Sequence, residues 1–152
     1  MEMSFRRARR ADLDALVTML ADDSLGARRE RPGPPLPRAY EDAFAAIDAD
    51  PNQELVVAEC AGEPAGFLQI TFVPSLSYQG GWRALIESVR VAGMLRGRGV
   101  GRALLEHAID RARQRGCHVV QLTADRRRRD AIRFYESLGF ESTHEGLKFF
   151  LG

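Results

Sequence analysis

The segment Glu87–Gly116, ESVRVAGMLRGRGVGRALLEHAIDRARQRG, decides the fold class of this chain. It begins inside the run 82–91, WRALIESVRV, which is typical of a β-strand. A helix is predicted from about Gly99 to Arg115, because apolar residues recur there at a period near 3.6 (Val100, Leu104, Leu105, Ala108, Ile109 and Ala112). A second strand, CHVVQLTA, follows at 117–124. Strand, turn, helix and strand make a βαβ unit with parallel strands, so the sequence predicts an α/β protein.

The turn between this strand and helix alternates arginine with glycine: Arg96, Gly97, Arg98, Gly99, Val100, Gly101 and Arg102. The first turn of a helix has unpaired N–H groups and a partial positive charge, and glycine lets a ligand touch the main chain. These features predict an anion-binding site, for which phosphate is the usual ligand. The alternative is that the glycines only allow tight packing of the helix on the sheet. A P-loop is excluded because the only lysine is Lys148, and the GxGxxG fingerprint fails at its third glycine. What remains has the form [RQ]xxGx[GA].

The rest of the chain divides into short elements. Predicted strands and helices lie at 4–8, 12–23 with Asp12 as N-cap, 39–50, 54–60, 65–74 and 130–140, with a final hairpin over 141–152 turning at Glu145–Gly146. The strands 54–60 and 65–74 should form a hairpin. The proline-rich loop 22–37 interrupts the two N-terminal helices and is expected to form a wall over a site.

Composition limits the class of protein. The chain has 152 residues, a hydrophobic fraction of 45%, a charged fraction of 28% and a net charge of +1, so we expect one domain over 1–152. A net charge this small produces no strong electrostatic field that would favour binding to nucleic acid or to a membrane surface. The sequence has no run typical of a signal peptide or of a membrane span. Cys60 and Cys117 belong to no CxxC pair and are interpreted as buried, reduced thiols. A cytoplasmic location is the default expectation.

The glycine segment resembles the [RQ]xxGx[GA] motif of the GNAT superfamily of acetyl-CoA-dependent N-acetyltransferases. The similarity extends to the opening 5–16, FRRARRADLDAL, and to the late 130–140, DAIRFYESLGF, which carries Phe134, Tyr135, Gly139 and Phe140. The resemblance implies a single GNAT-like α/β domain. Its mixed, splayed sheet would have six to seven strands, flanked by about four helices.

The resemblance also implies acetyl-CoA as co-substrate and no metal. The implied cofactor-binding residues are Val89, Arg90, Val91, Arg96, Gly97, Arg98, Gly99, Val100, Gly101 and Arg102. Amides of 98–102 would hold the pyrophosphate, and the main chain of Val89 and Val91 would pair with the pantetheine arm, where the strands splay. Many members place an Asn near the next helix, whereas 125–130 reads DRRRRD. The run Arg126–Arg129 could reach the 3′-phosphate of CoA or be merely solvated.

Two catalytic residues are predicted. An amine is mostly protonated at neutral pH, so a base must take a proton before it attacks a thioester. Glu87 is the candidate base, because burial in its apolar strand would raise its pKa; an ion pair with a neighbouring Arg is the alternative. By resemblance, the amide of Val89 would stabilise the oxyanion and Tyr135 would protonate the departing thiolate. A core tyrosine is the alternative for Tyr135.

The acceptor is expected to be a small-molecule or peptide amine. Its predicted contacts come from the 22–37 loop and from SLSYQGGW: Leu25, Gly26, Glu30, Tyr78 and Trp82. The three histidines are not spaced as a metal cluster. Acetyl transfer should be direct, because both cysteines lie outside the matched positions. A homodimer is allowed, since family members often dimerise. Two alternatives stay open: a non-catalytic CoA-binding regulatory module, and a nucleic-acid binder, which would lack the interleaved aromatics of single-strand binding.

Overall fold

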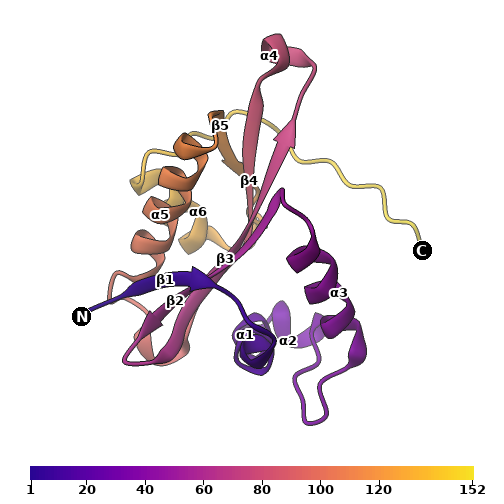
Figure 1. Cartoon of the computed structure of the whole chain (residues 1–152), viewed down its shortest axis with the longest axis vertical. Coiled ribbons are helices and arrows are strands. Elements are labelled where there is room, and N and C mark those ends of the chain that lie inside the picture. Colours follow the sequence, from indigo (N-terminus) through magenta and orange to yellow (C-terminus); the bar gives the residue numbers. More distant parts are fainter. The chain divides into compact units, whose positions relative to one another are not determined.

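The computed structural model describes all 152 residues (Figure 1). They form two compact units, Met1–Gln121 and Leu122–Gly152. The first unit contains β1 (Ser4–Arg7), η1 (Arg10–Asp12), α1 (Leu13–Ala21), α2 (Gly26–Arg29), α3 (Arg38–Ala49), β2 (Gln53–Cys60), β3 (Glu63–Pro74), α4 (Ser77–Gly80), β4 (Trp82–Val91), η2 (Gly93–Leu95) and α5 (Val100–Gln114). β5 (Cys117–Leu122) ends at the boundary, and α6 (Arg129–Ser137) lies in the second unit.

The strands form one mixed sheet in the order β1-β2-β3-β4-β5. The first three pairings are antiparallel, with Phe5 opposite Ala58, Val57 opposite Phe67 and Ile70 opposite Ile86. The α/β class is confirmed, and so is the hairpin of β2 with β3. The predicted count of six to seven strands is wrong because the sheet has five, and six α-helices replace the expected four.

The central strand β3 is covered on both of its faces. Gly66 faces α5, because a Cβ placed there would lie 3.0 Å from side-chain atoms of Leu104 and of Val100. Its neighbour Phe67 faces the other way, into a core cluster with Leu16 of α1 and with Val57, Ala8 and Met19. Successive strand residues point to opposite faces, so α5 and α1 lie on opposite sides of the sheet. Two-sided coverage also explains why residues 65–68 are buried without alternation.

Asp12 connects the first strand to the first helix. It occupies the N-cap position of α1, as predicted, but its carboxylate makes no capping bond to that helix. Instead it accepts hydrogen bonds from Nη1 and Nη2 of Arg6, at 2.8 and 2.9 Å, and from the backbone N–H of Arg9. The hydrogen bond from Arg6 holds the pKa of the buried Asp12 below its ordinary value.

A second buried carboxylate attaches α5 to the sheet. Glu54 of β2 accepts hydrogen bonds from Nε and Nη2 of Arg111 at 3.0 and 2.5 Å. Burial raises the pKa of Glu54, but the hydrogen bond and charge of Arg111, with the charges of Arg7 and Arg115, outweigh it and leave the pKa lowered. This contact holds the helix that follows the glycine segment in place.

The second unit contains α6 and a C-terminal segment without regular secondary structure. Gly139 follows α6 with φ 102°, and the N–H of Phe140 bonds to the carbonyl of Tyr135 at 3.2 Å, which ends the helix as predicted. The predicted hairpin over 141–152 is wrong: residues 140–152 form no helix or strand. A strand needs a neighbour to pair with its backbone, and this segment makes no strand pairing within the chain.

None of the helices combines the length and the apolar composition that a membrane crossing requires.

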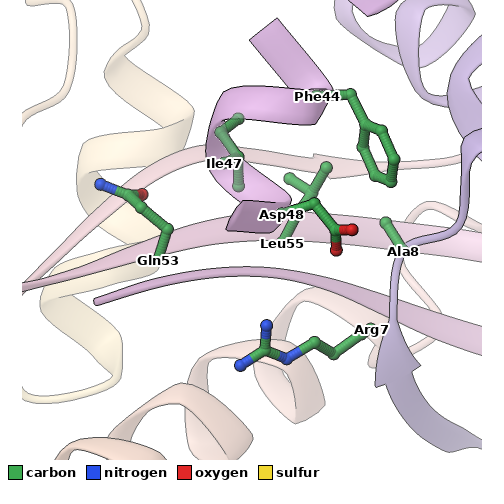
Figure 2. A pocket seen from close by; sticks show the side chains of 7 residues that line it. All are labelled: Arg7, Ala8, Phe44, Ile47, Asp48, Gln53 and Leu55. Carbon is green, nitrogen blue, oxygen red and sulfur yellow. The ribbon is translucent and has the colours of Figure 1, made fainter. Parts of the chain in front are cut away.

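A small cavity of about 10 Å³ lies between α3 and strands β1 and β2 (Figure 2). Phe44 and Ile47 reach toward it from α3, Leu55 lines it from β2, and Ala8 lines it directly after β1. It has room for about one water molecule, so it is a packing defect and not a ligand site.

Candidate active site

A bulge interrupts β4 beside the predicted base. Glu87 lies opposite Gln69 and Arg90 lies opposite Phe67, so two residues of β4, Ser88 and Val89, face one residue of β3. Ser88 has φ 58°, in the left-handed region that non-glycine residues rarely adopt. Bulges of this kind change where side chains point and are frequent beside active sites.

The bulge follows a regular alternation in the first half of β4. Ala84 and Ile86 are buried, whereas Leu85 is half-buried and Glu87 is exposed. The predicted burial of Glu87 is therefore wrong, because the side chain lies on the more open face of the strand. Any role of Glu87 as a base must rest on its accessibility and its position one residue before the bulge.

The glycine segment leads directly into the N-terminus of α5. Gly97 and Gly99 have φ of 77° and 88°, and no atom beyond the adjacent residues lies within 4 Å of a Cβ placed on either residue. Gly99 is the N-cap of α5, and no side chain caps the helix. The first intrahelical bond runs from the N–H of Ala103 to the carbonyl of Gly99, at 3.1 Å. The three N–H groups before Ala103 thus remain available at the positive end of a 15-residue helix.

Three arginines surround this helix start, and they differ in their partners. Arg96 donates from Nη2 to the backbone carbonyl of Asp22 at 2.9 Å and pairs with its carboxylate at 3.2 Å. Arg102 pairs with Glu106 at 3.4 Å. Arg98 is exposed and makes no ion pair. Open space, uncapped amides and an unpaired guanidinium together fit a phosphorylated ligand such as CoA.

The contact of Asp22 with Arg96 joins the end of α1 to the glycine segment, and no short-range sequence signal predicts it. An open surface depression lies next to it, lined by Asp14, Ala15, Thr18, Met19, Asp22, Pro64, Ala92 and Gly93.

The structure gives the predicted acceptor residues of the 22–37 loop different environments. Gly26 is buried, and a Cβ there would lie 1.9 Å from the carbonyl oxygen of Leu20, so this glycine serves packing of the loop. Glu30 accepts hydrogen bonds from the hydroxyl of Tyr40 at 2.9 Å and from Nε of Arg29 at 2.7 Å. Leu25 is half-buried. The segment also includes α2, a four-residue helix that the prolines did not suggest.

The second predicted acceptor loop lies between β3 and β4. Tyr78 is exposed at its tip, with φ 52°, and Gln79 beside it has φ 57°. The ring of Tyr78 lies against that of His118 of β5, with centroids 4.9 Å apart and the ring planes tilted by 32°. Trp82 is half-buried where β4 begins, opposite Pro74. Sequence spacing gave no reason to place His118 beside this loop, because the two rings lie 40 residues apart.

Tyr135 lies on α6 in the second unit. Its ring contacts those of Phe134 and Phe140, with centroids 5.6 and 6.0 Å apart. The arginine run before α6 is partly paired: Arg127 binds Asp125 at 2.7 Å, and Arg126 lies 3.7 Å from Glu145. The hydrogen bonds from Arg127 lower the pKa of Asp125.

Both cysteines are free and half-buried, not fully buried as expected. Burial raises the pKa of the Cys117 thiol, which makes it a weak nucleophile at neutral pH. No group of three or more His, Cys, Asp or Glu side chains is arranged to hold a metal ion.

Comparison with known proteins agrees with this geometry. Residues 17–140 match the sequence model of the Acetyltransferase (GNAT) family. The chain is 34% identical to an aminoalkylphosphonate N-acetyltransferase of Salmonella typhimurium over 107 residues, 70% of this chain and 69% of that protein. It is 32% identical to a streptothricin acetyltransferase of Streptomyces lavendulae, over 90% of this chain and 80% of that protein.

A crystal structure of a transcriptional regulator from Bacillus halodurans C-125 superimposes with a TM-score of 0.95 at 52% identity. The match covers 99% of this chain and 100% of that one. The family match spans most of the chain and includes both the bulged strand and the glycine segment. This chain therefore belongs to the Acetyltransferase (GNAT) family, and it is an N-acetyltransferase.

Proposed function

We propose that this chain transfers an acetyl group from acetyl-CoA directly to a primary amine. The observation that carries the proposal is the start of α5, where Gly97 and Gly99 have open surroundings. The unpaired Arg98 stands between these two glycines in the sequence, and the uncapped amides of the helix follow them. Family membership supports the same ligand.

The cofactor would be held chiefly by the main chain. The N–H groups of Val100, Gly101 and Arg102 would donate to the pyrophosphate, and Arg98 would add a charge-assisted hydrogen bond. Acetyl-CoA supplies the reaction with a thioester carbonyl carbon that an amine can attack. Arg96 would act mainly through Asp22, by holding the glycine segment against α1.

The bulge on β4 supports the proposed role of Val89. Because Ser88 and Val89 together face one residue of β3, the regular ladder is broken at this point. A main-chain N–H released from the ladder can donate to the thioester oxygen as negative charge develops there. Val91 would continue the contact along the pantetheine arm, as an added strand would.

Glu87 is the proposed base, and it acts from an accessible position. It would take a proton from the ammonium form of the acceptor, either directly or through one water. The neutral amine nitrogen then bonds to the acetyl carbon and gives its second proton to solvent, the carbon–sulfur bond breaks, and the sulfur leaves with the bonding electron pair. The hydroxyl of Tyr135 is proposed to return a proton to that sulfur. Neither cysteine is needed, and the raised pKa of Cys117 supports transfer without an acyl-enzyme.

The acceptor is proposed to be a small-molecule amine. The relatives named for aminoalkylphosphonate and streptothricin support this class over a peptide. Tyr78 and Trp82 remain the proposed contacts from one loop, and Leu25 and Glu30 from the other. Gly26 is omitted, because its burial gives it a packing role.

A panel of amines tests this function. Release of free thiol from acetyl-CoA should require an added amine, and mass spectrometry should show a gain of one acetyl group on that amine. Glu87→Gln should lower the rate by roughly 10²-fold at neutral pH while leaving acetyl-CoA binding intact. Binding without turnover for any amine would favour the non-catalytic module. A salt-dependent shift with DNA or RNA, with no effect of CoA, would favour the nucleic-acid binder.

A further inference from the structure

The sheet face that lies away from α5 carries polar side chains beside the proposed base. On that face, Gln69 and Thr71 of β3 are half-buried and Glu87 of β4 is exposed. The neighbouring residues on the α5 side are all at most 1% exposed: Leu68, Ile70, Phe72, Ala84 and Ile86. A ligand can therefore reach the polar face of these strands, whereas the core closes the other face.

The register of the strands places these polar residues next to one another. Gln69 lies directly opposite Glu87, and Thr71 lies directly opposite Gln53 of β2. Directly opposite side chains share a face of the sheet, with Cβ atoms about 4.5–5.5 Å apart, and Gln69 and Thr71 share it because they are two residues apart. Gln53, Gln69 and Thr71, which we call the polar row, thus extend from the proposed base across β3 to β2.

Hydrogen bonds within the polar row fix its side chains and leave some of its polar atoms unused. Oε1 of Gln53 accepts a hydrogen bond from Nε2 of Gln69 at 2.9 Å and another from Oγ1 of Thr71 at 3.0 Å. Oε1 of Gln69 and Nε2 of Gln53 make no hydrogen bond with the protein. The row therefore offers an acceptor and a donor whose positions are already set, which lowers the entropic cost of binding a ligand.

We propose that Gln69 selects acceptors that carry a hydroxyl group near the amine that is acetylated. This inference rests on the proposed function, because it takes Glu87 as the group that meets the amine. With the nitrogen at Glu87, a hydroxyl about two to five carbons away lies within reach of the opposite residue Gln69. A hydroxyl can donate to Oε1 of Gln69 and accept from Nε2 of Gln53, so it satisfies both unused groups. A methyl group in its place would leave both groups without a partner.

Thr71 acts in this selection as a positioning residue. Its hydroxyl holds Gln53, and Gln53 in turn holds the amide of Gln69. Thr71→Val removes this hydroxyl and keeps the shape of the side chain, so the preference for a hydroxyl-bearing acceptor should fall by about 2-fold. Thr71→Ser keeps the hydroxyl and should keep the preference. Equal losses of preference in the two variants would exclude the positioning role.

Matched pairs of amines test the role of Gln69. Each ω-amino alcohol of about two to five carbons is compared with the alkylamine that has a methyl group in place of the hydroxyl, and the ratio of the two kcat/KM values gives the preference. Comparing this ratio between wild type and Gln69→Leu cancels the difference in basicity between the two amines. We expect Gln69→Leu to lower the preference for the hydroxyl by at least about 5-fold. Gln121→Leu makes the same change at an exposed position of β5 and should leave the preference unchanged. Circular dichroism checks that each variant is folded.

Failure of this inference differs from failure of the proposed function. Amines that are acetylated with the same hydroxyl preference by wild type and Gln69→Leu would overturn the selection and leave the acetyltransferase function standing. No turnover with any amine would instead overturn the proposed function. The same pairs would then be titrated calorimetrically into the protein with CoA, where wild type should bind the amino alcohols more tightly than Gln69→Leu does. Equal affinities, or no binding to either protein, would overturn the selection.

Discussion

Substitution of Gly99 by valine separates the fold's need for this residue from the ligand's need for it. Gly99 has φ 88° and space around its Cβ position, so valine there is strained by its backbone and not by a clash. A left-handed residue with a side chain costs about 1–2 kcal/mol. For a protein of this size each kcal/mol lowers the melting temperature by about 2–4 °C. The unliganded variant should therefore melt about 2–8 °C below wild type.

Gly116 provides a matched control at the other end of the same helix. It follows α5 with φ 75°, and its Cβ position is equally open. Gly116→Val should therefore destabilise the unliganded protein by a similar amount. It lies at the carboxyl end of the helix, where no amide donors are exposed, so it should not affect an anion.

Differential scanning fluorimetry with acetyl-CoA distinguishes the two variants. A ligand at about 100 times its dissociation constant stabilises a protein by about 2.7 kcal/mol, which is roughly 5–10 °C here. Wild type and Gly116→Val should show this shift, and Gly99→Val should lose most of it, because a branched side chain would block the approach of the phosphates. Pantetheine without phosphates should shift wild type far less. Equal acetyl-CoA shifts for both variants would refute the anion site at α5.

Three further predictions concern chemistry, selectivity and acid stability. Glu87→Gln and Tyr135→Phe should both slow acetyl transfer roughly 10²-fold at neutral pH. Only the rate of Glu87→Gln should recover in alkali, and only the rate of Tyr135→Phe should be restored by an acetyl donor whose leaving thiol has a lower pKa. Wild-type rates for both variants in single-turnover assays would exclude these roles. Deleting part of RPGPPLPR, residues 31–38, should change amine preference but leave acetyl-CoA affinity nearly intact, and an unchanged preference across the panel would reduce the loop to packing. Asp12→Asn should destabilise the fold by about 1.5–3 kcal/mol at neutral pH. Because the pKa of Asp12 is lowered in the folded protein, the difference in unfolding free energy between wild type and variant should shrink as the pH falls below about 3.9 and vanish below the folded pKa. A difference in urea unfolding that is constant with pH would contradict the ion pair with Arg6.

Local sequence signals predicted most of the elements of the first unit. The helix α5 was expected from Gly99 to Arg115 and runs from Val100 to Gln114, with Gly116 just after it. The hairpin of β2 and β3 was also expected, and its turn at Ala61–Gly62 has φ of 51° and 81°, as a tight hairpin turn requires. These features depend on periodicity and on backbone conformations of single residues, which neighbouring letters are enough to specify.

The same signals were misleading where an element needs a distant partner. The alternation of WRALIESVRV placed Glu87 in an apolar strand, but burial follows from which elements cover each face, and the bulge at Ser88 breaks the period altogether. The segment 141–152 has a strand pattern, yet a strand forms only when another edge accepts its hydrogen bonds.

The sequence by itself determined the α/β class, the uncapped glycine start of α5 and the family, because these depend on residue order over short stretches. Only the tertiary structure decided that Asp22 holds Arg96, that the ring of Tyr78 contacts that of His118 and that Glu87 is exposed. Asp22 and Arg96 are separated by 74 residues, and Tyr78 and His118 by 40. Contacts over such separations arise from how helices and strands pack, and no local pattern encodes the distance between two side chains that the chain brings together only on folding.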